Sequence, residues 1–469
     1  MANYLFTLTI SPVQSFIAQA RKSQDLFAGS EILSQLMGKV LETFTVEERI
    51  FPQDEKAVSN KIVVKLSDKT EKQIKEIGEK LEKQINNDFL NAIFKETKCY
   101  DSALKDFFQV FWVAVELKEN YQESYKQLER NLGAVKNLRT FSQNPQPSGK
   151  AKCVLCGERN QAKEDKEDNL CLICYTKRKC EINNMDKEKF PSLADIVTFD
   201  RKDKLNGQDA EDFLDTNPSE KKHYALLHFD VDSLGKTLSG LNEQGQKDLS
   251  TVLGDFAQKV GSEVLTSQKG RTVYAGGDDF LGFVNLASVF VVMQEIKDAF
   301  GEVKTSFPNL TFSTSIVIAH YKTPLHKVLD YSRELLEESK NHFDDKNALG
   351  IMVMSSNAVI SKTICRYEDV ALLQKMKEAE MAKNLHFKLA QIFDYLGEMR
   401  YDEFLTQKAM MTVEIKRLLK REEGSFDEKL YNDLIAFFGN QIKGDSYAID
   451  FDNFIGFLKT LEQLRKVMP

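Results

Sequence analysis

Residues 272–284 read Thr-Val-Tyr-Ala-Gly-Gly-Asp-Asp-Phe-Leu-Gly-Phe-Val, two apolar β-like runs joined by two glycines and two aspartates. The pattern predicts a β-hairpin whose turn holds Asp278 beside Asp279. Gly276 and Gly277 supply backbone conformations that a Cβ would resist, and they let a bulky anion approach the main chain. Paired carboxylates suit Mg²⁺, which is commonly bound together with substrate phosphates. The first hypothesis is therefore nucleotidyl transfer, and the alternative is an ordinary Asp-rich hairpin turn.

Another acidic position lies at the end of an earlier predicted strand. Residues 224–229 form a short buried-strand pattern, which ends in Asp230-Val231-Asp232-Ser233-Leu234-Gly235-Lys236. Asp230 and the hairpin pair would together grip one or two metal ions about 4 Å apart, as in-line phosphoryl displacement requires.

The elements around these aspartates follow a known order. Apolar spacing predicts helices and strands at 249–264 (helix), 288–300 (helix), 311–318 (strand), 325–340 (helix) and 349–354 (strand). The order β-α-β-β-α-β, with one more α-β unit appended, is the ferredoxin-like plan of polymerase and cyclase palms. We therefore assign residues 223–360 to a catalytic palm domain.

The rest of the chain predicts three further units in an α+β protein. Residues 1–141 alternate predicted strands and helices and form a first, degenerate palm that lacks the acidic hairpin. Residues 142–222 hold a polar linker and a zinc-binding module. Residues 361–469 show helical stripes, one of them over 404–419, and predict a C-terminal helical bundle. The expected fold is thus two ferredoxin-like palms, an inserted zinc module and a bundle.

The inserted module is marked by four cysteines. Cys153 and Cys156 form one Cys-x-x-Cys knuckle, and Cys171 and Cys174 form another after fourteen residues. This spacing predicts four thiolates arranged tetrahedrally around Zn²⁺, with no open position, so the metal would be structural. Basic side chains near the cysteines predict a local basic patch made of Lys150, Lys152, Lys177, Arg178 and Lys179. This patch is either a solubilising surface or a contact for the nucleic-acid backbone.

Composition limits the remaining possibilities. The chain has 469 residues with 64 basic and 71 acidic side chains, a formal net charge of −7, which excludes a global attraction to nucleic acid. Its apolar runs fall short of the ~20 residues that span a bilayer. The N-terminus lacks a basic segment leading into a secretory apolar core, so we expect a cytoplasmic protein without membrane contact.

Four motifs in order resemble one family, the large polymerase/cyclase subunit of type III CRISPR effector complexes in its Cmr branch. They are Ile10-Ser11-Pro12-Val13-Gln14-Ser15-Phe16-Ile17 with the following Ala20–Ser30 segment, the zinc knuckles, the Gly-Gly-Asp-Asp hairpin, and Ile318-Ala319-His320-Tyr321-Lys322-Thr323-Pro324-Leu325. The resemblance covers practically the whole chain.

The resemblance implies partners and an activity. The partners would be the other type III-B subunits, a guide RNA and a target RNA whose pairing switches on the palm. The palm would then act as a nucleotidyltransferase that joins ATP-derived nucleotides, typically into cyclic oligoadenylates. Some relatives instead attach AMP to S-adenosylmethionine, which would make that molecule a co-substrate.

The resemblance also implies residue roles. Asp230, the Val231 carbonyl and Asp278 would bind Mg²⁺ or Mn²⁺, and Asp279 would complete the carboxylate set as a ligand or by activating the attacking 3′-hydroxyl. The residues implied to lie near the nucleotide are Asp232, Ser233, Gly235, Gly276 and Gly277, together with Lys340, which would neutralise the triphosphate.

Many family members carry an HD nuclease domain before the first palm. This chain begins at the palm strand, and none of its six histidines is followed by aspartate, so no HD nuclease activity is expected. Two other functions stay open from the sequence. One is a diguanylate-cyclase-like signalling enzyme, because Gly-Gly-Asp-Asp-Phe is close to that family's motif. The other is a non-catalytic scaffold of the RNA-guided complex.

Overall fold

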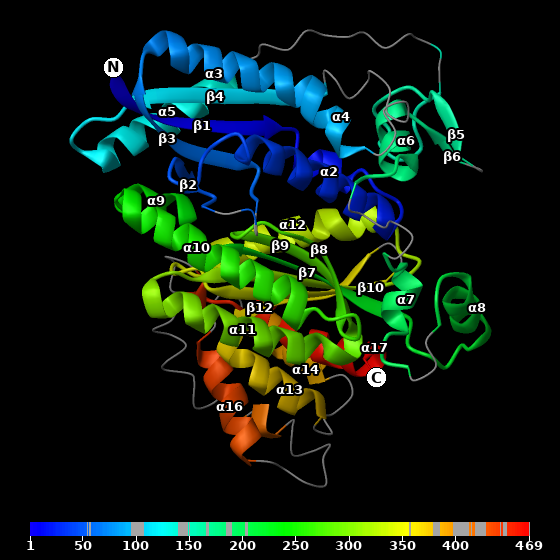
Figure 1. Cartoon of the computed structure of the whole chain (residues 1–469). Coiled ribbons are helices and arrows are strands. Elements are labelled where there is room, and N and C mark those ends of the chain that lie inside the picture. Colours follow the sequence, from blue (N-terminus) through cyan, green and yellow to red (C-terminus); the bar gives the residue numbers. More distant parts are fainter. Residues whose placement is uncertain are drawn as a thin grey trace.

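Two principal sheets organise the chain, and helices lie between and around them (Figure 1). The mixture of helices and strands predicted from the sequence is confirmed. The computed structural model describes residues 1–53, 55, 58–94, 107–138, 149, 151–165, 168–183, 190–201, 205–355, 358–378, 385–396, 412–413, 415–417, 428–440, 442–443 and 448–468. Within these ranges no helix has the length and apolar character that crossing a bilayer requires.

The first sheet is antiparallel and has the strand order β2-β3-β1-β4. Its strands are β1 (Ala2–Ser11), β2 (Arg49–Phe51), β3 (Lys61–Lys69) and β4 (Gln109–Glu116). Its helices are α1 (Gln14–Ala18), α2 (Ser23–Leu41), α3 (Glu71–Gln84), α4 (Leu90–Ile93) and α5 (Tyr121–Asn137), with a π-helical turn at Ile85–Phe89 between α3 and α4. The α2 helix lies on the side of this sheet that faces the second sheet (Figure 1).

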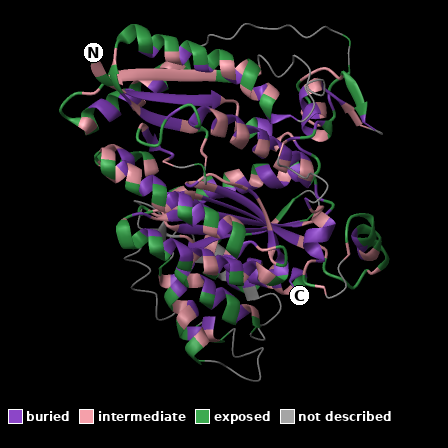
Figure 2. Ribbon diagram, in the orientation of Figure 1, coloured by how far each residue is buried: buried purple, intermediate pink, exposed green. Residues whose placement is uncertain are grey.

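The second sheet has six strands in the order β12-β11-β10-β7-β9-β8. They are β7 (His223–Val231), β8 (Gly270–Ala275), β9 (Asp279–Asn285), β10 (Phe312–His320), β11 (Ala348–Met354) and β12 (Val359–Arg366). The helices are α9 (Leu234–Gly240), α10 (Glu243–Lys259, continued by a π turn at Val260–Val264), α11 (Val289–Ser306) and α12 (Leu325–His342). The strands are largely buried (Figure 2), as expected for a sheet covered on both faces.

Both sheets have the same arrangement of their first four strands. Numbered along the chain within each sheet, the strands lie in the order 4-1-3-2, which is the split βαβ plan. The β2–β3 connection of the first sheet therefore corresponds to the Gly-Gly-Asp-Asp turn of the second. A repeat that the sequence indicates only through element order is visible in the topology.

The C-terminal part differs from its prediction at the start. The expected boundary after residue 360 falls inside β12, which pairs with β11 from Met354 opposite Val359 to Ala348 opposite Arg366. Residues 359–366 are rich in β-branched side chains, which favour a strand over a helix. The helices that follow are α13 (Val370–Glu378), α14 (Leu385–Leu396), α16 (Glu428–Gly439) and α17 (Phe451–Val467).

These helices do not stand apart from the second sheet. The α17 helix packs on β12, where a Cβ on Gly456 would lie 2.2 Å from the Lys362 carbonyl oxygen. A short strand pair, β13 (Ile442–Lys443) and β14 (Ala448–Ile449), precedes α17. Most of the helix predicted at 404–419 lies outside the described residues.

The module with the cysteines lies beside the end of α2 (Figure 1). It contains a short hairpin, β5 (Lys163–Asp165) and β6 (Asp168–Leu170), followed by α6 (Leu172–Lys179). Two helices, α7 (Leu193–Val197) and α8 (Gln208–Thr216), lead from it to β7. The linker predicted over 142–152 falls almost entirely on residues that the structure does not describe.

Candidate active site and metal centre

The strand register brings two of the three predicted aspartates directly opposite each other. Asp230 on β7 pairs with Asp279 on β9. The Val231 N–H donates to the Asp278 carbonyl oxygen at 2.8 Å, which fixes the hairpin turn against the end of β7. Gly277 has a φ of +88°, a conformation that favours glycine. The predicted convergence of Asp230 with the hairpin is therefore present.

The aspartates line a cavity of about 280 Å³ that lies between the two sheets. Asp230, Asp278, Asp279 and Gly276 are on one side of it. The opposite wall comes from α1, α2 and the β2–β3 connection of the first sheet, through Val13, Gln14, Ile17, Ser30, Leu33, Ser34, Met37, Val58, Ser59 and Asn60. The two corresponding hairpin connections thus face one cavity.

Protein donors hold Asp279 in place. The Tyr274 hydroxyl donates to both carboxylate oxygens at 3.1 Å, and His228 Nε2 lies 3.3 Å from Oδ1. On the other side of the imidazole ring, Nδ1 lies 3.4 Å from the Ser332 hydroxyl on α12. His228 was not predicted from the sequence, although its position two residues before Asp230 places both side chains on the same face of β7.

A lysine from α12 reaches the carboxylates. Lys340 Nζ lies 2.6 Å from Asp230 Oδ1, although more than a hundred residues separate them in the sequence. Burial raises the pKa of Asp230 despite this ion pair, and Asp279 adds to the rise. Burial, together with Asp279 and Asp230, raises the pKa of Asp278 to about 7. Negative charge is therefore concentrated here beyond what Lys340 neutralises.

Six of the predicted residues are not among those that line the cavity, namely Val231, Asp232, Ser233, Gly235, Gly277 and Lys340. The Asp232 carboxylate accepts hydrogen bonds from the Thr311 and Ser313 hydroxyls, each at 2.9 Å, and from the Asn347 N–H at 3.0 Å. It thus joins the end of β7 to the start of β10 and to the loop before β11. Ser233, with a φ of +55°, and Gly235 are exposed at the start of α9. Because these contacts occupy its carboxylate, Asp232 is not proposed to contact the nucleotide.

The carboxylate set fits a hard divalent cation. Its donors are oxygens, and Mg²⁺ prefers such ligands. Burial is the main cause of the raised pKa of Asp278, and a cation would relieve the repulsion from Asp279 and Asp230 that adds to it. The carboxylate oxygens of Asp230, Asp278 and Asp279 do not all lie within 4.8 Å of one another. The donor set nevertheless matches the chemistry of a magnesium site, and Lys340 supplies the positive charge beside Asp230 when no cation is bound.

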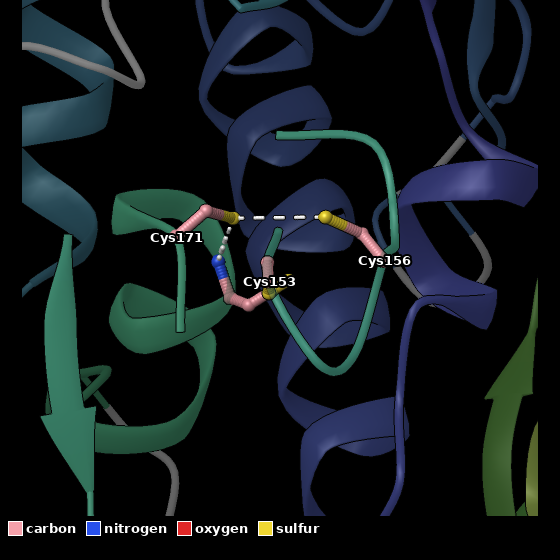
Figure 3. A group of neighbouring side chains, drawn as sticks. Cys153, Cys156 and Cys171 are labelled. Carbon is pink, nitrogen blue, oxygen red and sulfur yellow. Dashed lines mark hydrogen bonds between the residues drawn. The ribbon is translucent and has the colours of Figure 1, made fainter. Parts of the chain in front are cut away.

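The four cysteines form a compact sulfur cluster. Their Sγ atoms all lie within 4.8 Å of one another, and Cys156 Sγ is 3.9 Å from Cys171 Sγ (Figure 3). Tetrahedral Zn–S bonds of about 2.3 Å place sulfurs about 3.8 Å apart, so this group has the dimensions of a zinc site. Cys153, Cys171 and Cys174 are buried, and four thiolates would fill the tetrahedral shell of a zinc ion.

The basic patch predicted around the module is contradicted in part. Lys177 is 1% exposed, and the Arg178 side chain is 6% exposed and paired with Asp25 and Asp168. Lys179 lies 2.6 Å from Asp165. The helical spacing of α6 directs Lys177 and Arg178 toward the first unit, so these two charges serve contacts within the chain.

Comparisons with known proteins agree with this geometry. The family model described as "Cas10/Cmr2, second palm domain" matches residues 223–350, and the model "CRISPR-associated protein Cmr2, N-terminal" matches residues 5–95. The Cmr subunit Cmr2 of Pyrococcus furiosus is 24% identical, and the alignment covers 97% of this chain and 74% of that protein. Cmr2 of Saccharolobus solfataricus is 26% identical over 41% of this chain and 22% of that protein.

Solved structures share the fold at low sequence identity. A type III-B Cmr-beta structure in the apo state matches with a TM-score of 0.68 at 13% identity, covering 100% of this chain and 82% of that one. A Cmr-beta structure bound to cognate target RNA gives 0.63 at 14% identity, covering 99% and 83%. A Csm1–Csm4 cassette in complex with cA4 gives 0.53 at 14% identity, covering 99% and 70%.

Proposed function

The chain belongs to the Cas10/Cmr2 family, and on this premise we propose that it is a nucleotidyltransferase that joins ATP-derived nucleotides into a second messenger. It would act within a type III-B CRISPR complex, with the other subunits and a guide RNA, and pairing with target RNA would switch synthesis on. The observation that carries the proposal is the cavity that Asp230, Asp278 and Asp279 share with the wall of the first unit. Structures of Csm1–Csm4 with cA4 and with one ATP support the substrate class.

The proposed metal ligands are Asp230, the Val231 carbonyl, Asp278 and Asp279. A bound Mg²⁺ or Mn²⁺ would polarise a phosphoryl oxygen and neutralise charge on the departing pyrophosphate. The protein holds Asp279 ready through Tyr274 and His228 before any substrate arrives. Such fixed orientation lowers the reorganisation needed when charge develops.

The turn of the hairpin is the proposed phosphate contact. Gly276 lines the cavity, and neither it nor Gly277 carries a side chain that would keep a phosphate from the main chain. Lys340, released from Asp230, would pair with the triphosphate. The reaction is attack of a 3′-hydroxyl on an α-phosphate with departure of pyrophosphate, and it yields a cyclic oligoadenylate, or AMP joined to S-adenosylmethionine if that molecule is the acceptor.

The test uses the reconstituted complex with labelled ATP and Mg²⁺, with and without target RNA. S-adenosylmethionine and GTP are added in separate reactions. We expect ATP-derived products only when target RNA is present, and no product from an Asp278→Ala/Asp279→Ala double variant. Products that persist in the double variant would refute the assigned site. Consumption of GTP alone would favour a diguanylate-cyclase-like enzyme, and no turnover under any condition would favour a scaffold.

Lys340→Met is expected to change metal and nucleotide affinity in opposite directions. In the protein without nucleotide, Lys340 Nζ occupies a place beside Asp230 that a divalent cation would also seek. Its removal should therefore tighten binding of Mn²⁺ alone. The same change removes a charged contact to the triphosphate, so ATP should bind at least about tenfold more weakly. Titration calorimetry with Mn²⁺ and with a non-hydrolysable ATP analogue measures both effects.

Lys340→Arg is the matched control, because it keeps the positive charge on the same helix position. We expect it to bind the analogue close to the wild-type value. Wild-type analogue affinity in Lys340→Met would exclude Lys340 from the triphosphate site.

A further inference from the structure

A buried lysine, Lys177, contacts the part of the first unit that forms one wall of the cavity. Lys177, at the end of α6, donates from its ammonium group to the carbonyl oxygens of Phe16 and Gln19, the latter at 2.7 Å, and lies 3.4 Å from that of Ile17. These carbonyls belong to the C-terminal end of α1 and the residue after it. A positive charge at this end of a helix satisfies carbonyls that have no partner within the helix.

The Lys177 ammonium group is also closely packed against its neighbours. The ammonium lies 4.9 Å from the centroid of the Phe16 ring, within cation–π range. A Cβ on Gly29 of α2 would lie 3.4 Å from Lys177 Nζ and 3.3 Å from the Ile17 Cα. The glycine thus lets α6, α1 and α2 meet at one point.

The neighbouring arginine holds the start of α2. Arg178 Nε and Nη2 donate to the two oxygens of Asp25 at 3.1 and 2.7 Å. Asp25 also accepts hydrogen bonds from the N–H groups of Arg21 and Lys22, which lead into α2. Burial alone would raise the pKa of Asp25, but Arg178, helped by the Lys22 N–H and by Lys177, holds that pKa below its ordinary value. The α2 entry therefore depends on a charge from α6.

The opposite end of α6 carries half of the cysteine cluster. Cys171 caps the helix and Cys174 lies in its first turn, so a bound zinc would fix the orientation of α6. A second link runs through Arg159, whose Nε donates to Cys171 Sγ at 3.4 Å and whose Nη2 donates to the Gln19 side chain. The cluster and the end of α1 are thus joined by two routes.

Helices α1 and α2, which these contacts hold, also line the proposed nucleotide cavity. Gln14 and Ile17 of α1 and Ser30 and Ser34 of α2 face it, and Ile17 takes part in both the cavity wall and the Lys177 contact. The α1 helix has five residues, too few to be stable alone, so its position is set by what it packs against.

We propose that Lys177 and Arg178 are positioning residues that make nucleotide binding depend on the four-cysteine site. The inference rests on the proposed function, because it takes the cavity to be a nucleotide pocket. Loss of zinc would release the start of α6, loosen α1 and the start of α2, and so weaken the wall opposite the carboxylates, without altering any residue that touches the nucleotide.

The test compares full-length Lys177→Met with Lys179→Met, which removes the same charge from the same turn but from a more exposed side chain. Three quantities are measured: zinc content, affinity for a fluorescent ATP analogue with Mg²⁺, and hydrogen exchange of amides in 14–18 and 23–41. We expect Lys177→Met to keep its zinc, to bind the analogue about tenfold more weakly and to exchange faster in both helices. Lys179→Met should match the wild type.

Zinc-selective chelation of the wild-type protein should reproduce the loss of affinity and the faster exchange. Unchanged affinity and exchange in zinc-loaded Lys177→Met would overturn the proposal. If Lys177→Met does not fold, unchanged affinity and exchange after chelation of the wild type would overturn it equally. A wild-type protein that binds no nucleotide would refute the proposed function, whereas the exchange data would still report whether α6 holds the wall.

Discussion

Asp278→Asn is expected to reduce nucleotide synthesis by about 10³-fold or more while raising the thermal stability of the metal-free protein. Loss of a metal ligand removes several kcal/mol of transition-state stabilisation, and each 1.36 kcal/mol is tenfold in rate. The stability change has the opposite sign because burial and two neighbouring carboxylates disfavour the ionised form of Asp278 in the folded protein. Its pKa of about 7 lies well above the value near 4 of an unfolded chain, owing to burial and to Asp279 and Asp230.

The pH dependence of this effect follows from linkage. A carboxyl whose pKa is raised by folding costs stability once the unfolded chain ionises, so the wild type loses stability as pH rises from about 4 to about 7. Asparagine has no such loss. The advantage of the variant should therefore grow as the pH rises and be larger at pH 8 than at pH 5, as measured by thermal unfolding in magnesium-free buffer.

Asp298→Asn is the control for this experiment, because it makes the same change on an exposed carboxylate of α11. It should leave both synthesis and the pH profile unchanged. If Asp278→Asn were less stable than the wild type at pH 8, the interpretation that folding disfavours the ionised Asp278 carboxylate would be wrong.

Cys171→Ser is expected to reduce bound zinc from about one per chain to near zero and to lower the thermal midpoint. Structural zinc sites contribute roughly 10–16 kcal/mol of binding free energy in small domains, far more than a hydrogen bond. Cys171 also caps α6, where its sulfur accepts from the Cys174 N–H. Serine is a good N-cap, so the start of α6 is retained and the effect is confined to the metal.

The matched control is Cys365→Ser, which changes a buried thiol of β12 that has no part in the cluster. Elemental analysis should find wild-type zinc content in this control. Wild-type protein that purifies and stays folded without zinc would contradict the structural role of the metal.

Local sequence patterns predicted much of the fold and of the candidate site. The Gly-Gly-Asp-Asp turn and the apolar runs beside it define the β8–β9 hairpin, and the acidic end of β7 follows from one strand pattern. The opposition of Asp230 and Asp279 then results from pairing in an ordinary split βαβ sheet. Lys340 came from the family resemblance, and the structure places it on Asp230.

Contacts between distant segments could not be read in the same way. Nothing local to Gln14, Ser30 or Asn60 indicates that they face the aspartates, because that depends on how two sheets pack. Lys177 and Arg178 look like ordinary surface charges in a basic run, yet their partners lie in another unit. The strand at 359–366 was missed because the helical stripes that follow it dominate the pattern.

The division of the cavity between two sheets has a consequence for how the protein is made. Residues 13–60 leave the ribosome before residues 228–333, so the two halves of the cavity lining are synthesised at different times. Because Arg333 of α12 donates to the Gln14 carbonyl at 3.1 Å, that late helix closes the assembly. A nascent chain that stops short of α12 therefore has the acidic side chains but lacks the helix that joins their sheet to Gln14 of the first unit.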